Sequence, residues 1–373
     1  MKNIILVGNS TWGMYNFRKG VILYLKNHNY NIIVASPPDE YTERLKDLGI
    51  EYVPLKRLQP QGANILADIR FFRELKSIYK KYKPELIFHY TIKPNIYGSL
   101  AASALKISSV AVVTGLGYTF TYTTAISFVA KALYKIAFKK NKAVWFLNDD
   151  DKNFFVSKKL LARDLAFVLP GEGVNTDFFK PSSVIEPERE VVKFLLISRM
   201  IYDKGIVEYV EASKILKSRG HKIESELLGF VEVINPKAIT KETITLWEKE
   251  APVRYYGSTP DVLPYIQRAD CIVLPSFYRE GIPRTLLEGA SVGKPVITTN
   301  NVGCKEVVED GVTGYLCKIK DELDLADKME KFILLSNAEK KQMGQKGRER
   351  IKQFFDERIV CEIYLNTVKK LVK

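Results

Sequence analysis

The chain has 373 residues, of which 46% are hydrophobic and 27% charged, and its formal net charge is +14. This length exceeds one ordinary hydrophobic core, so we expect two globular domains. No apolar run is long enough for a membrane-spanning helix, and the opening MKNIILVGNS turns polar too early for a signal peptide, so we expect a cytoplasmic protein. Four cysteines and three histidines show no metal-binding spacing, which favours buried free thiols over a zinc site or a disulfide framework.

The basic excess lies in the first half of the chain. Residues 1–180 hold 26 Lys and Arg against 14 Asp and Glu, whereas residues 181–373 hold 31 against 29. A basic surface suits an acidic partner such as a membrane or a nucleic acid. Nucleic acid is not expected here, because no recognisable binding motif accompanies the basic residues.

The densest basic segment is predicted to form an amphipathic helix. In residues 127–142, SFVAKALYKIAFKKNK, Lys131, Lys135 and Lys139 recur near helical spacing, and Phe128 is one of the apolar residues around them. Such a helix can lie on an anionic membrane surface. An ordinary helix that packs on its own domain and keeps its lysines in solvent explains the same pattern.

Strands and helices alternate along the first half. Residues 3–7 are predicted to form a strand that leads into a loop with Gly13, and a helix follows over residues 15–27. Further strands are expected at residues 31–37, 86–89, 110–115 and 144–148. Gly115 and Gly117 follow one of these strands, where glycine either lets the backbone approach a ligand closely or makes a tight turn.

The same alternation restarts in the second half, after a polar, proline-bearing linker at residues 181–190. A strand within residues 191–200 is followed by a helix over residues 205–218, and later strands are expected at residues 226–228, 253–257, 271–275 and 296–299. Two β/α halves of similar length predict an α/β protein with two doubly wound, Rossmann-like domains that face each other across a cleft. We assign residues 1–180 and 191–355 to these domains, and residues 356–373 to a helix that packs back toward the first.

The segment DCIVLPSFYREGIPRTLLEGASVGKPVITT, residues 270–299, places two acids beside a helix start. Its apolar beginning predicts a buried strand, and Pro283 suits the first position of a helix because its missing N–H would be unpaired there. Glu280 then lies in the loop and Glu288 inside the helix. The backbone N–H groups of residues 281–285 can receive a phosphate, assisted by the helix dipole.

Several motifs together resemble family 4 retaining glycosyltransferases of the GT-B fold. These are SRMIYDKG at residues 198–205, the Glu280 and Glu288 pair, and the segments HYTIKPNIYGSLAA, VTGLGYTF, PGEGVNTDFF and NNVGCKEVVEDGVTGYL. Within this family the chain resembles bacterial enzymes that add a hexose or N-acetylhexosamine to a sugar on undecaprenyl diphosphate during glycan or lipopolysaccharide biosynthesis.

The resemblance implies a role for each matching residue of the donor site. Arg199 and Lys204 would bind the donor diphosphate, the former as a fork and the latter as a point charge. Glu288 would accept hydrogen bonds from the ribose hydroxyls, and Glu280 would contact the donor sugar and stabilise positive charge at its anomeric carbon. The remaining donor-binding residues would be Gly281, Ile282, Pro283, Arg284, Thr285, Gly13, Gly115 and Gly117.

The first domain would receive the acceptor, and Lys93 and Asn95 would meet its diphosphate. Many family members carry a histidine near the end of the fourth strand, but that position falls on Ile92 in this sequence, and His89 lies three residues earlier. His89 therefore keeps two interpretations, a contact with the donor or a structural role.

The implied function is a metal-independent, retaining glycosyl transfer with α linkage. The donor would be a UDP-sugar carrying N-acetylgalactosamine or a related hexose or N-acetylhexosamine, and the acceptor a saccharide linked to undecaprenyl diphosphate. No cofactor or metal is expected, because cations and a helix end take the phosphate charge, and Asp149, Asp150 and Asp151 are interpreted as a helix cap. We expect a peripheral protein on the inner face of the bacterial plasma membrane.

Two alternatives remain. A GT-B nucleotide-sugar 2-epimerase would release an altered sugar nucleotide without an acceptor, but the additional acids and histidines of that class are missing here. A catalytically inactive membrane-surface scaffold would be expected to lack one of the four charged donor-site residues, and all four are present.

Overall fold

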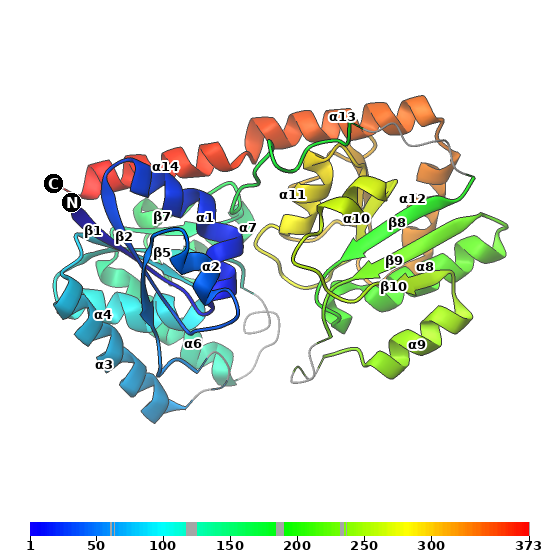
Figure 1. Ribbon diagram of the computed structural model, residues 1–373. Helices are drawn as coiled ribbons and strands as arrows, with labels where there is room; N and C mark the ends of the chain where they lie inside the picture. The colour runs from blue at the N-terminus through cyan, green and yellow to red at the C-terminus, as the bar shows by residue number, and fades with distance from the viewer. Residues whose placement is uncertain are drawn as a thin grey trace. The chain divides into compact units, whose positions relative to one another are not determined.

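The computed structural model describes residues 1–59, 62, 64–116, 125–183, 190–231, 235 and 237–372. Contacts divide the chain into two compact units, both drawn in Figure 1. The first comprises Met1–Gly173 and Glu357–Lys373, and the second comprises Val174–Asp356. Of the expected linker, residues 184–189 lie outside the described residues. Residues 174–180, which precede the linker, belong by their contacts to the second unit.

In the described part of the first unit, seven parallel strands form one sheet. They are β1 (Lys2–Val7), β2 (Tyr30–Ser36), β3 (Glu51–Pro54), β4 (Leu86–Tyr90), β5 (Ser108–Val113), β6 (Ala143–Phe146) and β7 (Ala166–Val168). Their order is β3-β2-β1-β4-β5-β6-β7. This is the order of a doubly wound sheet, in which the direction of winding reverses between β1 and β4.

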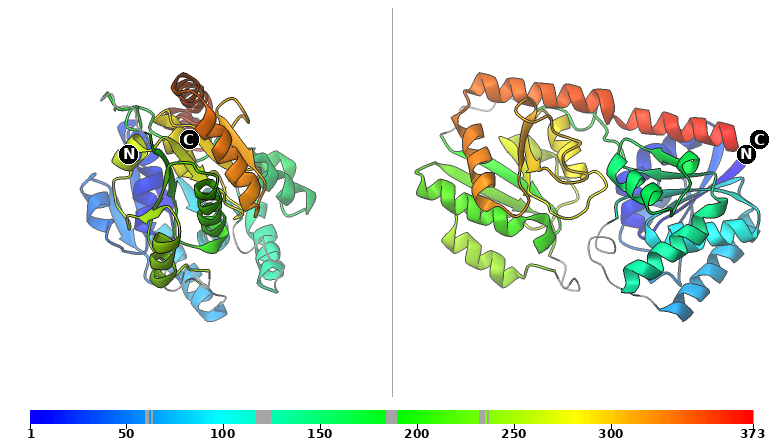
Figure 2. Two further views of the ribbon diagram at one scale, coloured as in Figure 1. Left: turned by 90° about the vertical axis from the view of Figure 1, so that its right-hand side faces the viewer. Right: turned by 180° about the vertical axis from the view of Figure 1, so that it is seen from behind.

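Helices cover both faces of this first sheet. They are α1 (Thr11–Asn27), α2 (Thr42–Lys46), α3 (Ile65–Tyr82), the π-helical turn η1 (Pro94–Gly98), α4 (Ser99–Ala104), α6 (Ala125–Ala137), α7 (Asp149–Ser157), α14 (Glu357–Leu371) and the 3-10 turns η2 (Phe138–Lys140) and η3 (Arg163–Leu165). On β4, Ile87 belongs to the apolar cluster under α3, whereas the ring of Phe88 lies 4.8 Å from that of Tyr364 on α14. Because successive strand side chains point to opposite faces, α3 and α14 lie on opposite sides of the sheet. α14 also contacts α1 (Figures 1 and 2).

The second unit repeats this architecture with six parallel strands among its described residues. They are β8 (Val192–Ile197), β9 (Ile223–Leu228), β10 (Val253–Tyr255), β11 (Cys271–Leu274), β12 (Val296–Thr299) and β13 (Gly314–Cys317). The order β10-β9-β8-β11-β12-β13 places the reversal between β8 and β11. The helices are the 3-10 turn η4 (Tyr202–Lys204), α8 (Ile206–Ser218), α9 (Lys241–Glu250), α10 (Leu263–Arg268), α11 (Arg284–Ser291), α12 (Glu322–Leu334) and α13 (Asn337–Phe354).

Both faces of the second sheet are covered as well. The ring of Phe194 on β8 lies 5.9 Å from that of Phe332 on α12, and Phe194 pairs in register with Cys271. The next residue, Ile272, packs so closely on α11 that a Cβ at Gly289 would lie 2.5 Å from its side chain. α11 and α12 therefore cover opposite faces. The prediction of two doubly wound α/β domains is confirmed, and all four cysteines are buried free thiols as expected.

Two helix starts differ from the prediction by one position. The side chain of Asn148 caps α7 by accepting a 2.8 Å hydrogen bond from the Asp151 backbone N–H, so the acidic triplet occupies the first turn instead of the cap. There the three carboxylates complement the helix dipole. Pro283 has an extended ψ of 117°, so it precedes α11, and Arg284 is the first helical residue.

Candidate functional site

Three of the charged residues predicted in the second unit follow β8 and β11, the neighbouring strands at which the winding reverses. Arg199 and Lys204 follow β8, and Glu280 follows β11. The backbone N–H groups of Phe277 and Tyr278 donate to the carbonyl oxygen of Asp203, at 3.1 and 3.0 Å. These bonds join the loop after β11 to η4. The site therefore forms where open α/β sheets bind ligands, at the carboxyl ends of the strands beside the reversal.

A glycine makes the close approach of these two loops possible. Gly205 follows η4 with φ of +76°, and a Cβ at this position would lie 2.1 Å from the carbonyl oxygen of Pro275. A larger residue would therefore both strain the backbone and push the loop after β11 away. Gly205 ends the motif SRMIYDKG, so the glycine of that motif has a packing reason.

Lys204 and Glu280 form an ion pair in this loop junction. Each side chain is only 12% exposed, so water screens the pair weakly. The hydroxyl of Ser276, which is fully buried, donates to Glu280 Oε1 at 3.0 Å, and the Tyr278 ring lies 5.3 Å from Lys204 Nζ. The Glu280 carboxylate is thus held in one place by a cation and a hydroxyl.

Glu288 lies inside α11, as predicted, and has a different environment. It is almost completely buried, and Nε of Arg284, one helical turn earlier, donates to its Oε1 at 3.0 Å. Burial raises the pKa of the Glu288 carboxyl, and the Arg284 guanidinium partly opposes this shift. The prediction used Arg284 only for its backbone, whereas its side chain holds Glu288. Gly281, Ile282 and Pro283 precede the helix and are buried, and Thr285 is half-buried in its first turn.

Residues after β12 complete the support of this loop, a role that the sequence motifs did not indicate. The Asn301 side-chain amide donates to the carbonyl oxygens of Ser276 and Tyr278, at 3.3 and 3.0 Å. Gly303, with φ of +85°, approaches so closely that its Cβ would lie 2.5 Å from the carbonyl oxygen of Gly281. The polar run directly after the strand VITT was the available signal, because carboxyl ends of adjacent parallel strands share one edge.

In the first unit, most predicted ligand residues have partners within the unit. Lys93 Nζ lies 2.7 Å from Asp68 Oδ1 in a pair that is about as buried as the Lys204 pair. The Asn95 side chain is fully buried and donates to the Val112 carbonyl oxygen at 2.9 Å. The backbone N–H of Gly13 donates to Ser10 Oγ at 3.1 Å, which caps α1. Gly115 has φ of +125°, and Gly117 lies outside the described residues.

His89 occupies a structural position. Its ring is fully buried, its Nε2 lies 2.9 Å from the Tyr79 hydroxyl, and a Cβ at Gly98 would lie 2.3 Å from the ring. Burial lowers the pKa of His89 to about 3, so the imidazole is neutral at physiological pH. These contacts fix the ring between α3 and η1.

The predicted basic helix corresponds to α6 and η2. Phe128, Lys135 and Lys139 are exposed, Lys131 is half-buried, and the Lys131 ammonium lies 5.4 Å from the centre of the Phe128 ring. Within the described ranges, no helix is long and apolar enough to cross a membrane. Among the same residues, no group of three or more His, Cys, Asp or Glu is placed to hold a metal ion.

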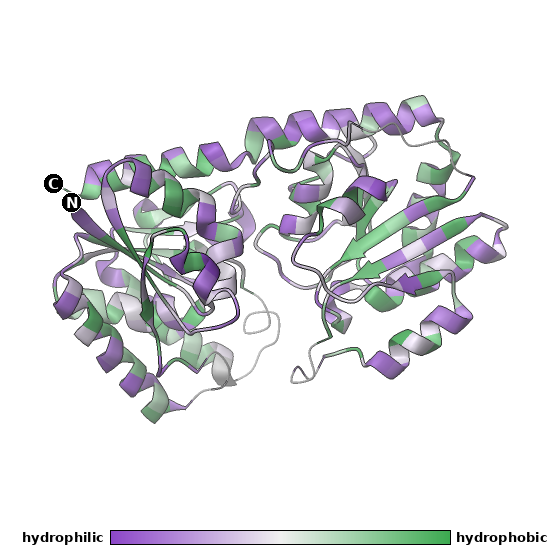
Figure 3. Ribbon diagram, in the orientation of Figure 1, coloured by the Kyte–Doolittle hydropathy of each residue, from purple (hydrophilic) through white to green (hydrophobic). Residues whose placement is uncertain are grey.

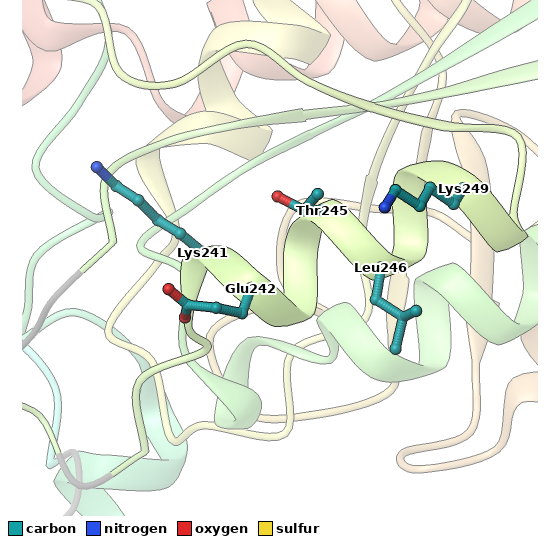
Figure 4. Close-up of a pocket in the computed structure, with 5 residues that line it drawn as sticks. All are labelled: Lys241, Glu242, Thr245, Leu246 and Lys249. Carbon is teal, nitrogen blue, oxygen red and sulfur yellow. The ribbon is translucent and has the colours of Figure 1, made fainter.

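A separate hollow of about 330 Å³ lies on α9 of the second unit. Figure 4 shows that its lining side chains, Lys241, Glu242, Thr245, Leu246 and Lys249, all come from this one helix. Because no second element contributes a polar group, the hollow lacks the convergent polar groups of a ligand site.

Comparisons with known proteins identify relatives of both halves. Residues 3–148 match the family model described as glycosyl transferase 4-like, and residues 177–350 match that of glycosyl transferases group 1. An N,N'-diacetylbacillosaminyl-diphospho-undecaprenol α-1,3-N-acetylgalactosaminyltransferase from Campylobacter jejuni is 28% identical over 376 aligned residues, which cover 96% of each chain.

Solved structures resemble the whole chain at lower identity. A glycosyltransferase from Rickettsia africae superposes with a TM-score of 0.81 at 22% identity, over 100% of this chain and 99% of that chain. HepE from Anabaena, in complex with UDP and glucose, gives 0.82 at 17% identity, over 99% and 100% of the two chains. These likenesses establish the GT-B fold.

Proposed function

We propose that this chain transfers a sugar from a UDP-sugar to a saccharide on undecaprenyl diphosphate. It belongs to the glycosyltransferases, since its first half matches the glycosyl transferase 4-like model and its second half the group 1 model. The observation that carries the proposal is the placement of Arg199, Lys204 and Glu280 on adjoining loops at the carboxyl ends of β8 and β11. The acceptor class is that named for the Campylobacter relative, and UDP is the nucleotide in the HepE complex.

When the donor binds, its diphosphate replaces Glu280 as the partner of Lys204. Without a donor, Lys204 and Glu280 neutralise each other. The β-phosphate takes the Lys204 ammonium, Arg199 binds the phosphate oxygens as a fork, and Glu280 is then available to accept hydrogen bonds from the donor sugar. Ser276 keeps its hydrogen bond to Glu280 Oε1 during this exchange and so holds the carboxylate in place. The helix start at residues 281–285 adds backbone N–H groups to the phosphate site.

The transfer then proceeds without a metal. The bond from the anomeric carbon to the β-phosphate oxygen breaks, and the Lys204 and Arg199 cations stabilise the charge on the departing UDP. The acceptor hydroxyl attacks the same face of the sugar, and the departing phosphate oxygen accepts its proton. This path retains the configuration and gives an α linkage from an α-linked donor. Glu280, beside the anomeric carbon, stabilises its positive charge in the transition state.

Glu288 binds the ribose in this proposal. A carboxylate accepts hydrogen bonds from both ribose hydroxyls only when it is ionised. Arg284 favours the ionised form, because its guanidinium opposes the effect of burial on the pKa of Glu288. Glu288 thereby contributes to donor affinity and takes no part in bond breaking.

The acceptor must be reached at a membrane, and α6 offers a surface for this contact. The exposed Phe128 and Lys135 of α6, with Lys139 of the following turn η2, combine an apolar ring with cations, as interfacial helices do. The protein then acts as a peripheral protein on the cytoplasmic face. N-acetylgalactosamine, or a related hexose or N-acetylhexosamine, is the proposed sugar.

UDP release, measured with a series of UDP-sugars and a lipid-linked acceptor, tests the proposal. We expect Glu280→Ala to lower kcat about 100-fold with a small change in donor KM, and Glu288→Ala mainly to raise donor KM. Equal effects of both variants on both constants would contradict the division of roles. Conversion of a UDP-sugar without an acceptor would instead favour a 2-epimerase.

A further inference from the structure

A second cationic feature of the first unit lies outside the predicted residues. Arg57, Arg70, Arg73 and Glu74 line a hollow of about 630 Å³ between the loop after β3 and the exposed side of α3. Three guanidinium groups face one carboxylate there, so the hollow carries a cationic excess. All three arginines are exposed, and an ion from solution can therefore reach them.

The single carboxylate of the hollow is already committed to the backbone. Glu74 Oε1 accepts from the Lys56 N–H at 2.8 Å, and Glu74 Oε2 accepts from the Arg57 N–H at 3.0 Å. Among the described residues, no side-chain hydrogen bond or ion pair is found for Arg57, Arg70 or Arg73. Glu74 thus shapes the hollow, while the three guanidinium groups keep their donors for a ligand.

Exposed apolar side chains continue the same face of α3 toward its start. Ile65, Leu66 and Ile69 are 75%, 67% and 42% exposed, and the beginning of α3 is hydrophobic in Figure 3. At about 100° per residue these three side chains share an arc of about 140° with Arg70 and Arg73. At about 1.5 Å per residue, the centre of the apolar group lies about 7 Å along the axis from the two arginines.

We propose that this hollow binds the phosphate headgroup of an anionic lipid, with the first turn of α3 inserted among the acyl chains. Guanidinium groups bind phosphate oxygens as a fork, and a helix face that joins exposed apolar side chains to cations is typical of helices at an anionic membrane surface. A free phosphate would satisfy the arginines and leave the apolar turn in water. α3 and α6 both contact η1, so the headgroup site and the α6 surface lie on the same side of the first sheet.

This inference goes beyond the proposed transfer reaction and is tested without turnover. Full-length protein is sedimented with phosphatidylcholine vesicles that do or do not contain phosphatidylglycerol. Arg70→Gln/Arg73→Gln should weaken binding to the anionic vesicles about 25-fold, at about fivefold for each charge lost. The matched control, Lys80→Gln/Lys81→Gln, removes the same charge from the same helix about 14 Å further along, and should weaken binding less than about threefold.

Two further arms identify the ligand. Ile65→Ser/Leu66→Ser should weaken binding to anionic vesicles, whereas Leu246→Ser, an equally apolar exposed site on α9, should not. Equal losses for the arginine and lysine pairs, or no loss for the arginine pair, would overturn the headgroup site in favour of diffuse charge. Release from the vesicles by inorganic phosphate, but not by potassium chloride of equal ionic strength, would overturn the lipid in favour of a free phosphate. None of these outcomes depends on whether UDP is released.

Discussion

The two sheets have the same order of strands around their reversal points, yet their polar residues are used differently. At β8 and β11, Lys204 and Glu280 form a pair whose members sit on facing loops at the sheet edge. At β1 and β4, the corresponding polar residues bond to neighbouring elements of their own unit. Lys93 is paired with Asp68 of α3, and the His89 ring is bonded to Tyr79.

A reversal point in the sheet therefore determines where loops lie, but it does not determine which side chains they present. Both units place loops at the carboxyl ends of the central strands. Only the side chains decide whether a loop presents charge to a ligand or uses it to hold helices on the sheet. In the second unit the Ser276 hydroxyl donates to the Glu280 carboxylate, whereas in the first unit Asp68 accepts hydrogen bonds from Lys93 and the Tyr97 hydroxyl.

The sharpest test of this comparison uses two matched lysines. Lys204 and Lys93 each follow a central strand, and each side chain is 12% exposed. Lys204→Met should lower kcat/KM about 1,000-fold, because one preorganised charge at the leaving phosphate is lost. Lys93→Met should lower kcat/KM less than about tenfold and instead lower Tm, because the buried Asp68 carboxylate loses its cation and keeps only the Tyr97 hydroxyl. A large loss of acceptor affinity in Lys93→Met would instead support the predicted contact between Lys93 and the acceptor diphosphate. Steady-state kinetics and thermal melts separate the two outcomes.

The structural role of His89 predicts a dependence of stability on pH. The unfolded chain binds a proton on this ring below its ordinary pKa of 6.5, whereas the folded ring does so only near 3. The unfolded state therefore binds more protons in this window, and the free energy of unfolding falls as the pH falls, by about 2 kcal/mol between pH 7 and pH 5. Urea unfolding at both values measures it. His89→Gln should remove most of this fall, and His28→Gln, an exposed control, should leave it unchanged.

Two buried serines, one in each unit, allow the same comparison to be made with single hydroxyl groups. Ser276 holds Glu280, whereas Ser36 of the first unit bonds Thr11 at 2.8 Å. Ser276→Ala should lower kcat about tenfold with little change in donor KM, because the carboxylate loses its fixed orientation. Ser36→Ala should lower stability and leave kcat within about twofold. If both variants reduce only stability, Ser276 has no positioning role.

The smallest expected effect concerns the pair within α11. Arg284→Met should raise donor KM about fivefold, because Glu288 loses the guanidinium that favours its ionised form. The value of kcat should stay within about twofold. A parallel fall in kcat would indicate that Arg284 contacts the donor phosphate directly.

Much of this arrangement could be predicted from the sequence, because it depends on local pattern. Apolar runs and glycine-containing loops indicated the central strands of both sheets. The loop position of Glu280 and the helical position of Glu288 followed from the SFYREGIPRTLLE segment alone. Family resemblance added the roles of Arg199 and Lys204, which remain predictions.

The partners of these residues could not be predicted, because they come from distant parts of the chain. Asn301, after β12, supports the loop that follows β11, and Asp68 lies on α3, 25 residues before Lys93. Asn95 was predicted to meet the acceptor diphosphate, whereas its side chain in η1 is buried in the interior. Such contacts depend on which elements the sheet order brings together, and a local pattern contains no information about that.

Because of how the chain is divided, the two units become complete at different stages of synthesis. The second unit is one continuous segment, Val174–Asp356, whereas the first needs α14 from beyond it. Until α14 is made, Phe88, Trp145 and Tyr90 lack the Tyr364 ring and hydroxyl that cover them. A nascent first unit therefore exposes these aromatic side chains until the second unit has been synthesised, and surface exposed in this way is prone to aggregation. The half of the protein that is translated first is the last that can finish folding.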